Sequence, residues 1–423
     1  MNPTIWILTA GFALLMAIGV PFVFAIGLSV IAVLVSMDIP SILLPQTLIA
    51  GTQSFSLLAI PFFMLAGELM TAGGLSRRLV AVADVVVRHL PGGMGHVTIL
   101  AAVIFAAISG SAPATTAAIG AIMIPAMIER GYDGAYATAL SVSAGVLAPL
   151  IPPSIAFVIW GVIAEQSISK LFLSGVVPGL VMAVALMMVV ALRARTDKLP
   201  RIARATSNEV QKAVWDGKWA LMAPLIVLGG IYAGIFTPTE SAAVACLYSL
   251  AVGICVEKRI ALKDLPRIVL SAMKISSIVM AIIAVSAGFG ILVAQEQLAM
   301  KLAAFLGDNI QQKWVMLLLL NVAFFLLAAV MDEIAIMVIL GPMLIAIGNR
   351  FGVDPIHFGA IIVTNVSIGM AAPPIGYCLF VGMAISGLSL ARVARAIWPM
   401  VIAMLAVLFL TTYIPGFSLA FQG

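Results

Sequence analysis

Charge is scarce in this sequence of 423 residues: Lys, Arg, Asp and Glu together account for 9% of it. A soluble domain carries roughly a quarter charged residues, so the composition excludes one. Hydrophobic residues account for 63%, and many stretches reach the ~20 apolar residues that a membrane-spanning helix requires. We therefore expect an all-α polytopic membrane protein.

Cysteine is also rare. Cys246, Cys255 and Cys378 are scattered through apolar sequence, so they indicate neither a disulfide framework nor a metal site. The net charge of +5 does not predict nucleic-acid binding, because the cations cluster beside hydrophobic stretches. Residues 193–218 alone hold seven Lys or Arg against three Asp or Glu, which is typical of a cytoplasmic loop. The N-terminus lacks a basic start and an obvious cleavage site, so we expect no removed signal peptide.

Two stretches of the chain follow the same plan, one from Ile108 and the other from Ala328. Each contains a Gly-x-Asp loop, at residues 131–133 and 352–354, and in each a Pro-Pro pair begins 21 residues after the glycine of that loop. Apolar segments that are interrupted at matching positions of two halves indicate the binding site of a secondary transporter. The alternative is two unrelated membrane helices with chance prolines, but spacing and residue type agree together.

The first copy opens with two apolar arms around the residues SGSAPATT, at 97–127. Small and hydroxylated residues at mid-depth predict a re-entrant hairpin, which a membrane tolerates where the hairpin is buried or lines a cavity. The alternative is a single long helix whose polar residues pack against a neighbour. A second hairpin is expected at 315–347, and broken crossing helices are expected at 136–164 and 356–381.

The remaining stretches give the topology. Residues 5–36 form either one long helix or two, and further crossings are expected at 57–75, 171–192, 219–236, 241–256 and 268–293. The basic, amphipathic segment 75–89 predicts a helix that lies in the cytoplasmic interface, and 298–306 is its counterpart before the second copy. Counting crossings against the positive-inside rule places the second hairpin on the opposite face from the first, so the copies have inverted topology.

This organisation divides the chain into six parts. They are scaffold helices with a first arm at 1–92, the first half of a transport domain at 93–165, scaffold helices with the basic loop 193–218 at 166–293, a second arm at 294–312, the second half of the transport domain at 313–387, and a C-terminal helix at 388–423. We expect the two halves of the transport domain to form one rigid unit that the arms connect to the scaffold.

Candidate ligand residues gather at the two tips and breaks. They are Ser109, Ser111, Thr115 and Thr116 facing Ser141, Ser143 and Gly145 in the first copy, and Asp332 and Glu333 facing Thr364, Asn365 and Ser367 in the second. Sodium is a hard cation that binds oxygen, and unwound segments add backbone carbonyls. Asp332 is the strongest signal, because a carboxylate within an apolar stretch is functional by default. A neutral acid or a partner in helix packing is the alternative, and the role of Glu333 stays open.

Three other polar positions have more ordinary interpretations. Glu68 lies inside a span, where a carboxylate is expected to face protein or water. Asn321 is predicted to form an interhelical hydrogen bond rather than to bind substrate. Neither broken segment contains an arginine, so we expect helix ends, hydroxyls and sodium to meet an anionic substrate.

The motifs SGSAPATTAAIG, APLIPPSI, MDEIA, GVDPIHFG and TNVSIGMAAPPIG resemble, in order and from end to end, the large membrane subunit of tripartite ATP-independent periplasmic (TRAP) transporters. The resemblance implies an ion-transporter-superfamily-like fold with two inverted repeats, each with a re-entrant hairpin and a broken transmembrane helix, that works as an elevator. It implies sodium-coupled import of an organic acid through a bacterial inner membrane. The implied partners are a periplasmic substrate-binding protein, a separate small four-helix membrane subunit and the lipid bilayer, with no organic cofactor and no nucleic acid.

The resemblance also implies two sodium sites. The first would comprise Ser109, Gly110, Ser111, Gly145, Ala148 and Pro152, and the second would comprise Asp332, Thr364, Asn365, Gly369 and Pro373. Substrate contacts are assigned to Ser111, Thr115, Thr116, Ser154 and Asn365. The copies are not identical, because Gly145 has no glycine opposite it and only the second tip is acidic. We therefore do not expect equal affinity at the two sites.

Three alternatives to this function are open. The runner-up is a stand-alone sodium- or proton-coupled carboxylate transporter that needs no binding protein. An intramembrane hydrolase would need motifs that we do not find, and an ion channel would need a continuous pore rather than an occluded site at the midplane. We therefore expect no enzymatic activity. Dicarboxylates, sialic acids, keto acids and sugar acids all fit as substrates.

Overall fold

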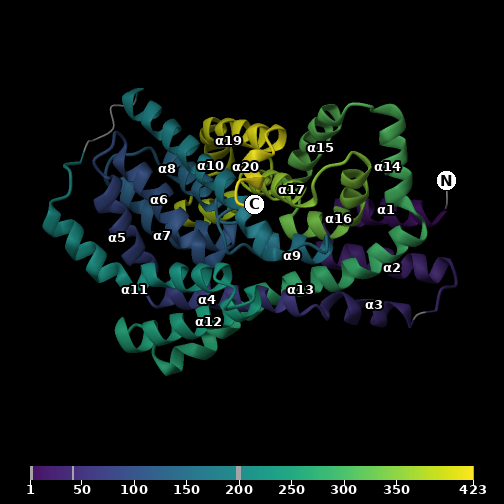
Figure 1. Cartoon of the computed structure of the whole chain (residues 1–423), viewed down its shortest axis with the longest axis horizontal. Helices are drawn as coiled ribbons and strands as arrows, with labels where there is room; N and C mark the ends of the chain where they lie inside the picture. The colour runs from purple at the N-terminus through teal and green to yellow at the C-terminus, as the bar shows by residue number, and fades with distance from the viewer. Residues whose placement is uncertain (1–2, 41, 197–201, 423) are drawn as a thin grey trace.

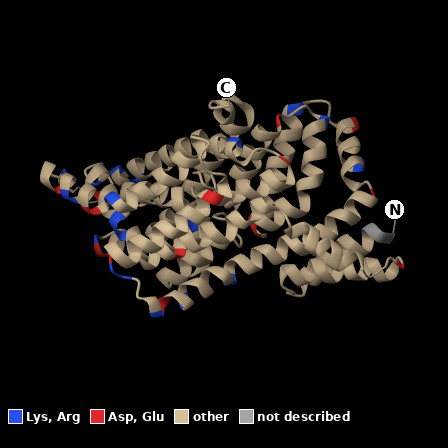
Figure 2. Ribbon diagram, turned by 60° about the horizontal axis from the view of Figure 1, so that its bottom comes forward, with Lys and Arg blue, Asp and Glu red and all other residues tan. Residues whose placement is uncertain are grey.

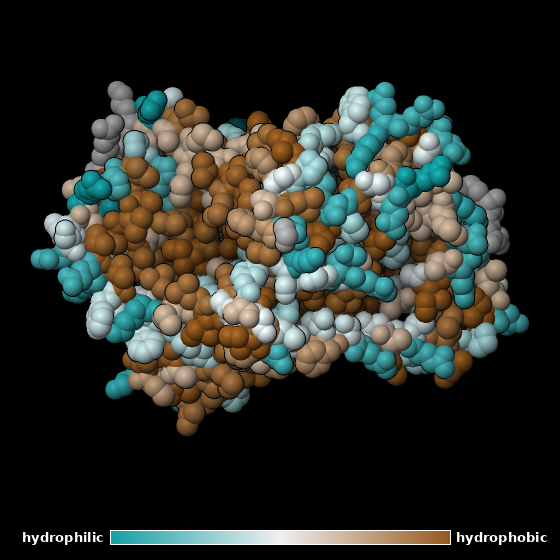
Figure 3. Space-filling view, viewed as in Figure 1, coloured by the Kyte–Doolittle hydropathy of each residue, from teal (hydrophilic) through white to brown (hydrophobic). Residues whose placement is uncertain are grey.

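The structure is a computed structural model that describes residues 3–40, 42–196 and 202–422. Within these ranges the chain forms helices joined by loops and contains no β-strand. Eight of the described helices are long and apolar enough to cross a membrane. Charged residues lie mostly toward helix ends and the edges of the bundle (Figure 2), and hydrophobic residues cover much of the left and central part of the face in Figure 3, with hydrophilic residues mainly at its right and along its margins. The chain is a multi-span membrane protein, as its composition predicts.

The N-terminal apolar stretch forms two helices, α1 (Pro3–Ala17) and α2 (Phe22–Ser36), which pack against each other. The chain turns between them at Gly19, whose φ of +84° suits glycine, and at Pro21, which has no backbone N–H to continue a helix. This settles the choice between one helix and two. Helix α3 (Leu43–Thr52) and a short turn at Phe55–Leu58 then lead into α4 (Ala59–Ala72), the crossing predicted at 57–75.

A short helix precedes each repeat, where the sequence predicts an arm. Helix α5 (Leu75–Val87) packs between α6 (Gly93–Ser109) and α11 (Ser207–Tyr232). Helix α14 (Leu298–Asn309) packs against α13 (Leu265–Gln295) and α16 (Glu333–Arg350). The two short helices lie at opposite ends of the molecule (Figure 1). They are therefore placed to connect different parts of the bundle at its two ends.

Both hairpins are present. Helices α6 (Gly93–Ser109) and α7 (Ala112–Glu129) are joined by two residues, and α15 (Lys313–Ala328) and α16 (Glu333–Arg350) are joined by residues 329–332. Gly110 has a φ of +57°, which longer side chains rarely adopt, so the chain can reverse its direction there. The alternative of a single long helix through SGSAPATT is wrong.

Both broken helices are present as well. They consist of α8 (Gly134–Gly145) and α9 (Ile155–Ile163) in the first repeat, and of α17 (Pro355–Gly369) and α18 (Tyr377–Ser386) in the second. An aspartate caps the first half of each: Asp133 accepts a hydrogen bond from the backbone N–H of Tyr136 at 2.9 Å, and Asp354 accepts one from that of Ile356 at 2.9 Å. The matching Gly-x-Asp loops therefore start the matching helices.

The remaining elements are α10 (Ile168–Thr196), α12 (Pro238–Ala251) with a π-helical end at Val252–Val256, a turn at Leu262–Asp264, α19 (Leu390–Tyr413) and α20 (Gly416–Leu419). Helices α4, α11, α12 and α13 pack in a connected group, with α12 against α4 and α11, and α13 against α4. The division predicted from the sequence places α10 among the scaffold helices at 166–293. In the structure α10 packs against α6, α9, α17 and α19. These contacts associate α10 and α19 with the hairpins and broken helices.

The two repeats exchange their second half-helices. Helix α9 packs against α16 of the other repeat, and α18 packs against α7 and α8. The glycines at these contacts are equivalent, and the isoleucines that they face are one position out of register: a Cβ on Gly120 would lie 3.3 Å from Ile385 Cδ1, and one on Gly341 would lie 2.6 Å from Ile163 Cγ2. Small residues allow helices to approach closely in a membrane. The hairpins and broken helices thus interlock.

Candidate functional site

The first hairpin tip lies directly against the first break. The backbone N–H of Ile155 donates to the carbonyl of Gly110 at 3.3 Å, and a Cβ on Gly110 would overlap the carbonyl oxygen of Pro153. On the other side of the break, a Cβ on Gly145 would overlap Thr116 Oγ1. The fold therefore brings together tip and break residues that lie 29 or more positions apart in the sequence, and it does so with glycine at both contacts.

Buried hydroxyls surround this contact. Ser109 Oγ and Thr115 Oγ1 share a hydrogen bond at 2.7 Å. Ser111 stands at the N-cap of α7, but its side chain accepts no capping hydrogen bond, and Thr116 Oγ1 has no nitrogen or oxygen partner among the described residues. Ser154 caps α9 by accepting from the backbone N–H of Phe157 at 3.2 Å. Ser111 and Thr116 therefore keep capacity to bind a ligand.

Two residues assigned to the first sodium site contribute their backbone only. Ala148 packs its methyl group with Ala106 and Ile151, and Pro152 has no polar side chain. The carbonyl oxygens of Ala148 and Pro152 accept no hydrogen bond from the described part of the chain. Carbonyls freed by a helix break are suitable ligands for a hard cation.

The second tip and break meet in the same way. The backbone N–H groups of Ile375 and Gly376 donate to the carbonyl of Ala329 at 3.1 and 3.0 Å, beside the Pro373 turn. A Cβ on Gly369 would overlap Ala328. Asp332 is the N-cap of α16, where its Oδ1 accepts from the backbone N–H of Ile334 at 3.0 Å. This places a carboxylate next to the second break, where the sequence predicts a cation.

Asn365 is held in place by its neighbours. Its Nδ2 donates to the backbone carbonyl and to Oδ1 of Asn321 at 2.9 and 2.8 Å, and Asn321 Nδ2 donates to Thr412 Oγ1 at 2.9 Å. The predicted interhelical role of Asn321 is confirmed. Asn365 Oδ1 is buried without a partner among the described residues, so it is available to a ligand. Thr364 Oγ1 donates to the carbonyl of Ala360 at 2.6 Å, which leaves its lone pairs as acceptors.

Glu333 is more prominent in the structure than in the sequence. Its side chain is buried at 4% exposure, and its Oε2 has no partner within the described residues. It begins α16 next to Asp332, and the second break contributes Cys378 to the same neighbourhood. The sequence alone leaves the role of Glu333 open, and the structure places it at the first position of α16, directly after the capping Asp332.

A cavity of about 290 Å³ lies beneath the first tip, between α4, α5 and α7. Ser109 stands at one end, where α4 comes close: a Cβ on Gly67 would lie 3.6 Å from Ser109 Cβ. Glu68 and Arg77 also line it, and α7 contributes small side chains such as Ala114. Arg77 was not expected at the site, because it lies on the arm rather than in a broken segment.

A second, smaller cavity of about 180 Å³ lies beside the second hairpin. It lies between α3, α9, α13 and α16, and Val338 and Pro342 of α16 are equivalent in the repeat to Ala117 and Ala121 of α7, which line the first cavity. No described residue of the second arm or of the second tip lines this cavity, so its place in the repeat differs from that of the first. Apart from Ser286, its side chains are apolar or absent, and no charged residue of the described ranges lines it.

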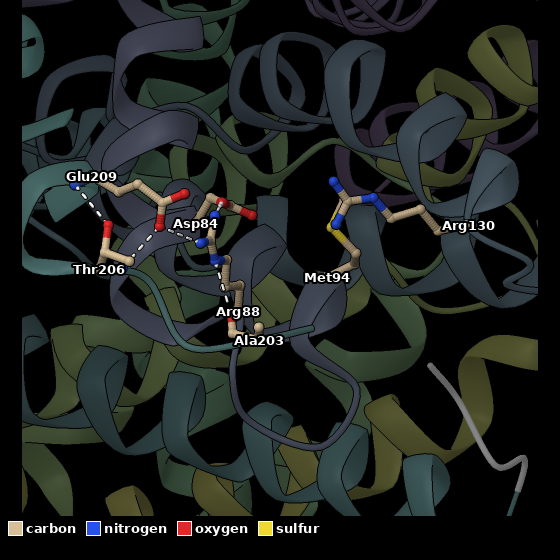
Figure 4. A network of polar contacts seen from close by, with 7 residues as sticks. All are labelled: Asp84, Arg88, Met94, Arg130, Ala203, Thr206 and Glu209. Atoms are coloured by element: carbon tan, nitrogen blue, oxygen red, sulfur yellow. Dashed lines mark hydrogen bonds and ion pairs between the residues drawn. The ribbon is translucent and has the colours of Figure 1, made fainter. Parts of the chain in front are cut away.

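Ion pairs tie the first arm to neighbouring helices. Arg88, at the end of α5, contacts Glu209 of α11 at 2.7 Å and Asp84 at 3.2 Å, and it donates to the carbonyl of Ala203 at 3.1 Å (Figure 4). Nearer the start of α5, Arg78 Nε donates to Glu257 at 3.1 Å. That hydrogen bond raises the pKa of Arg78. The arm is thus fixed at both ends by salt bridges.

Comparison with known proteins agrees with this geometry. Residues 9–417 match the family described as "Tripartite ATP-independent periplasmic transporter, DctM component". The chain is 40% identical over 414 residues to the isethionate TRAP transporter permease protein DctMQ of Oleidesulfovibrio alaskensis, which covers 97% of this chain but only 65% of that protein. It is 40% identical over 369 residues to the C4-dicarboxylate TRAP transporter large permease protein DctM of Pseudomonas aeruginosa, covering 87% of this chain and 86% of that one.

A solved structure shares the fold. MtrF of Neisseria gonorrhoeae, described with a class of antimetabolite efflux pumps, aligns with a TM-score of 0.58 at 11% identity, covering 87% of this chain and 82% of MtrF. At that identity the likeness concerns the fold alone. The sequence matches extend over nearly the whole chain, and the relatives are named as permeases rather than enzymes. This chain belongs to the DctM component family of tripartite ATP-independent periplasmic transporters.

Proposed function

We propose that the chain is the translocating subunit of a sodium-coupled importer of a small organic anion. The family description supports the outline: "tripartite" requires two further components, "ATP-independent" requires an ion gradient, and "periplasmic" requires a bacterial inner membrane. We assign the other components as a periplasmic substrate-binding protein and a small four-helix membrane subunit. The names of the relatives, which concern isethionate and C4-dicarboxylates, favour a carboxylate or sulfonate as the transported group.

One observation carries the proposal: four half-helices begin where the two tips meet the two breaks. Helices α7, α9, α16 and α18 start at Ala112, Ile155, Glu333 and Tyr377. A helix N-terminus carries partial positive charge and favours an anion, whereas Asp332 supplies a negative charge for a cation. Anion and cation bound at neighbouring positions compensate each other's charge. Their binding is therefore coupled, as symport requires.

The oxygen atoms without partners support two sodium sites. At the first, we assign Ser109, Gly110, Ser111, Gly145, Ala148 and Pro152 as the surrounding residues. At the second, we assign Asp332, Thr364, Asn365, Gly369 and Pro373. The first set offers hydroxyls and free carbonyls, and the second adds the amide oxygen of Asn365 and a full negative charge. Because charge strengthens cation binding, we propose that the second site binds sodium more tightly.

Movement of the site follows from the repeats. The larger cavity reaches Ser109 from the side of α5, which the positive-inside rule assigns to the cytoplasm, so this arrangement faces inward. We propose that the hairpins and broken helices, with α10 and α19, move as an elevator against α4, α11, α12 and α13. Inverted repeats allow inward- and outward-facing arrangements of similar free energy, so differential binding shifts the population between them.

Transport by purified components tests the proposal. The chain and its small subunit are placed in liposomes, and uptake of labelled succinate, isethionate or N-acetylneuraminate is measured with the cognate binding protein outside. We expect uptake of one of these anions only with an inward sodium gradient and loaded binding protein. Uptake of the free anion without binding protein would favour the stand-alone transporter. Uptake driven by a proton gradient alone would contradict the sodium assignment.

A further inference from the structure

The cavity beneath the first tip is lined by a cationic side chain, that of Arg77, which belongs neither to the proposed sodium sites nor to the proposed substrate contacts. Ser109 lines its deep end, and Ser76 and Arg77 of α5 line the end at the arm. Between them α4 contributes Glu68, and α7 contributes mostly small side chains, among them Ala114, Ala118 and Ala121, together with Ile122. The cavity therefore joins the proposed anion site to an arginine on the cytoplasmic side.

Arg77 differs from the other arginines of the arm. Arg78 is held by Glu257, and Arg88 is held by Asp84 and Glu209. Arg77 is exposed and forms no ion pair or hydrogen bond with the residues that the structure describes. A guanidinium carries five N–H donors in a planar arrangement that fits a carboxylate, and the three oxygens of a sulfonate offer similar acceptors. Arg77 is thus free to bind an anion that enters the cavity.

The part of α5 that carries Arg77 is attached to the scaffold, although the same helix also packs against α6 of the first hairpin. Arg78, the neighbour of Arg77, is anchored to Glu257 beyond α12, and the side chain of Arg259 covers Gly74, where a Cβ would lie 2.7 Å from Arg259 Cδ. Ser109, in contrast, belongs to the hairpin that we propose to move. Arg77 therefore shares a cavity with the tip in this inward-facing arrangement and is separated from it when the tip moves away.

The cavity beside the second hairpin makes no such connection. It is lined by residues such as Gly51, Ile283 and Ala287, and none of its lining residues within the described ranges is charged or belongs to the second arm or the second tip. An isolated guanidinium that is present only at the inner cavity favours the anion on that side alone. The asymmetry indicates a role in one half of the transport cycle.

We propose that Arg77 forms a release site for the transported anion. Its guanidinium binds the carboxylate or sulfonate as the anion leaves the tip, and Glu68 across the cavity weakens that binding enough for the anion to reach the cytoplasm. Because the site exists only in the inward-facing arrangement, internal anion stabilises this arrangement and slows the return of the empty carrier. The proposal rests on the proposed function.

Binding at this site is measured as inhibition of uptake by unlabelled anion inside the liposomes. Liposomes are preloaded with increasing unlabelled succinate, isethionate or N-acetylneuraminate, whichever the wild type transports, and initial sodium-driven uptake is measured with binding protein outside. For Arg77→Gln we expect the half-inhibitory internal concentration to rise roughly two- to five-fold, since an ion pair open to water contributes little. Arg77→Lys should retain most of the inhibition, and Glu68→Gln should shift the concentration in the opposite direction.

Arg392→Gln is the matched control, because it removes an exposed cytoplasmic arginine that does not line the cavity.

A second test attaches a charged group at position 77 by chemical labelling. Arg77→Cys is prepared together with Cys255→Ser, which removes the exposed native cysteine, and the new thiol is labelled with a cationic or an anionic thiosulfonate. The cationic adduct should restore inhibition and the anionic adduct should not. Equal inhibition in wild type and Arg77→Gln, or equal behaviour of both adducts, overturns the release site. If the wild type transports none of the probes, the proposed function itself has failed.

Discussion

The two hairpins share a backbone plan but differ in chemistry. Each lays its tip against the break of its own repeat, through Gly110 in the first and Ala329 in the second. The residue that precedes the second helix of the hairpin is Ser111 in the first hairpin and Asp332 in the second. The two hairpins thus share their backbone geometry, but only the second hairpin tip carries a negatively charged side chain. Geometry alone would predict two equal ion sites, and the charge predicts unequal ones.

The surroundings of the hairpins differ as well. The arm of the first hairpin brings Arg77 and Ser76 to the cavity that Ser109 also lines, whereas the cavity beside the second hairpin reaches neither the second arm nor a charged side chain of the described residues. If the substrate arrives bound to a binding protein, the outer side needs no free cation to attract it. The inner side, where the anion leaves into water, has one. The four predictions below break or sharpen this comparison, from the largest effect to the smallest.

Removing the charge of the second tip should have the largest effect. Asp332→Asn is expected to abolish sodium-driven uptake, because it removes the charged ligand of the second site. Asparagine is as good an N-cap as aspartate, so α16 should keep its start and the protein should keep its thermal stability. Uptake in liposomes and thermal unfolding measure the two effects separately.

Ser111→Ala is the matched change at the first tip. It removes a neutral hydroxyl and should lower uptake while leaving transport detectable. Wild-type uptake with unchanged sodium dependence in Asp332→Asn would remove Asp332 from the sodium site. Equal losses in both variants would show that charge does not distinguish the two tips.

Filling the cavity of the first hairpin should have the next largest effect. Ala114 lines the cavity beside Ser109, so Ala114→Trp should occupy the space through which the anion passes. We expect uptake to fall at least about ten-fold without loss of folded protein, because the new side chain projects into open volume rather than into a packed core. Ala420→Trp, at an exposed position near the C-terminus, is the control for a new tryptophan. Normal uptake by Ala114→Trp would place the substrate path elsewhere.

Substitutions at the packing contacts of the exchanged half-helices should have a smaller effect, on the stability of the protein. A methyl group on Gly341 would lie 2.6 Å from the stiff Ile163 Cγ2, whereas one on Gly120 would lie 3.3 Å from Ile385 Cδ1, at the flexible end of its side chain. Gly341→Ala should therefore destabilise the protein by about 1–3 kcal/mol from overpacking. For Gly120→Ala the gain in helix propensity, about 1 kcal/mol, should offset the tighter contact. Similar unfolding temperatures for the two variants would contradict the unequal packing.

Much of this arrangement was predictable from the sequence, because its signals are local. Gly110, the Pro-Pro pairs and the capping aspartates determine where helices end, and these ends agree with the structure. The packing partners were less accessible. Arg77 lines a cavity with Ser109 although they are thirty-two positions apart, and α10 contacts the hairpins although its basic end resembles a scaffold helix. Such contacts depend on how helices pack, which charge and hydropathy do not encode.

The smallest effect concerns a polar link that only the second repeat has. Asn321 joins Asn365 to Thr412, and the equivalent position in the first repeat is Leu100. Asn321→Leu copies the first repeat into the second and removes the side-chain acceptor of the Asn365 amide, while the backbone carbonyl at position 321 still accepts from it. The loss of one hydrogen bond costs about 0.5–1.5 kcal/mol, part of which the added apolar contact should offset. We expect a modest drop in thermal stability.

Sodium binding is the more informative measurement on this variant. Without the Asn321 side chain, Asn365 Nδ2 keeps only the backbone carbonyl at position 321 as an acceptor, so the orientation that presents Oδ1 to the second site is held less firmly. The half-saturating sodium concentration should therefore rise by roughly two- to five-fold, which corresponds to about 0.5–1 kcal/mol. In Asn365→Ala the ligand itself is lost, so adding Asn321→Leu to it should change the sodium requirement no further. If the two substitutions act additively on sodium binding, Asn321 does not act through Asn365, and the link serves stability alone.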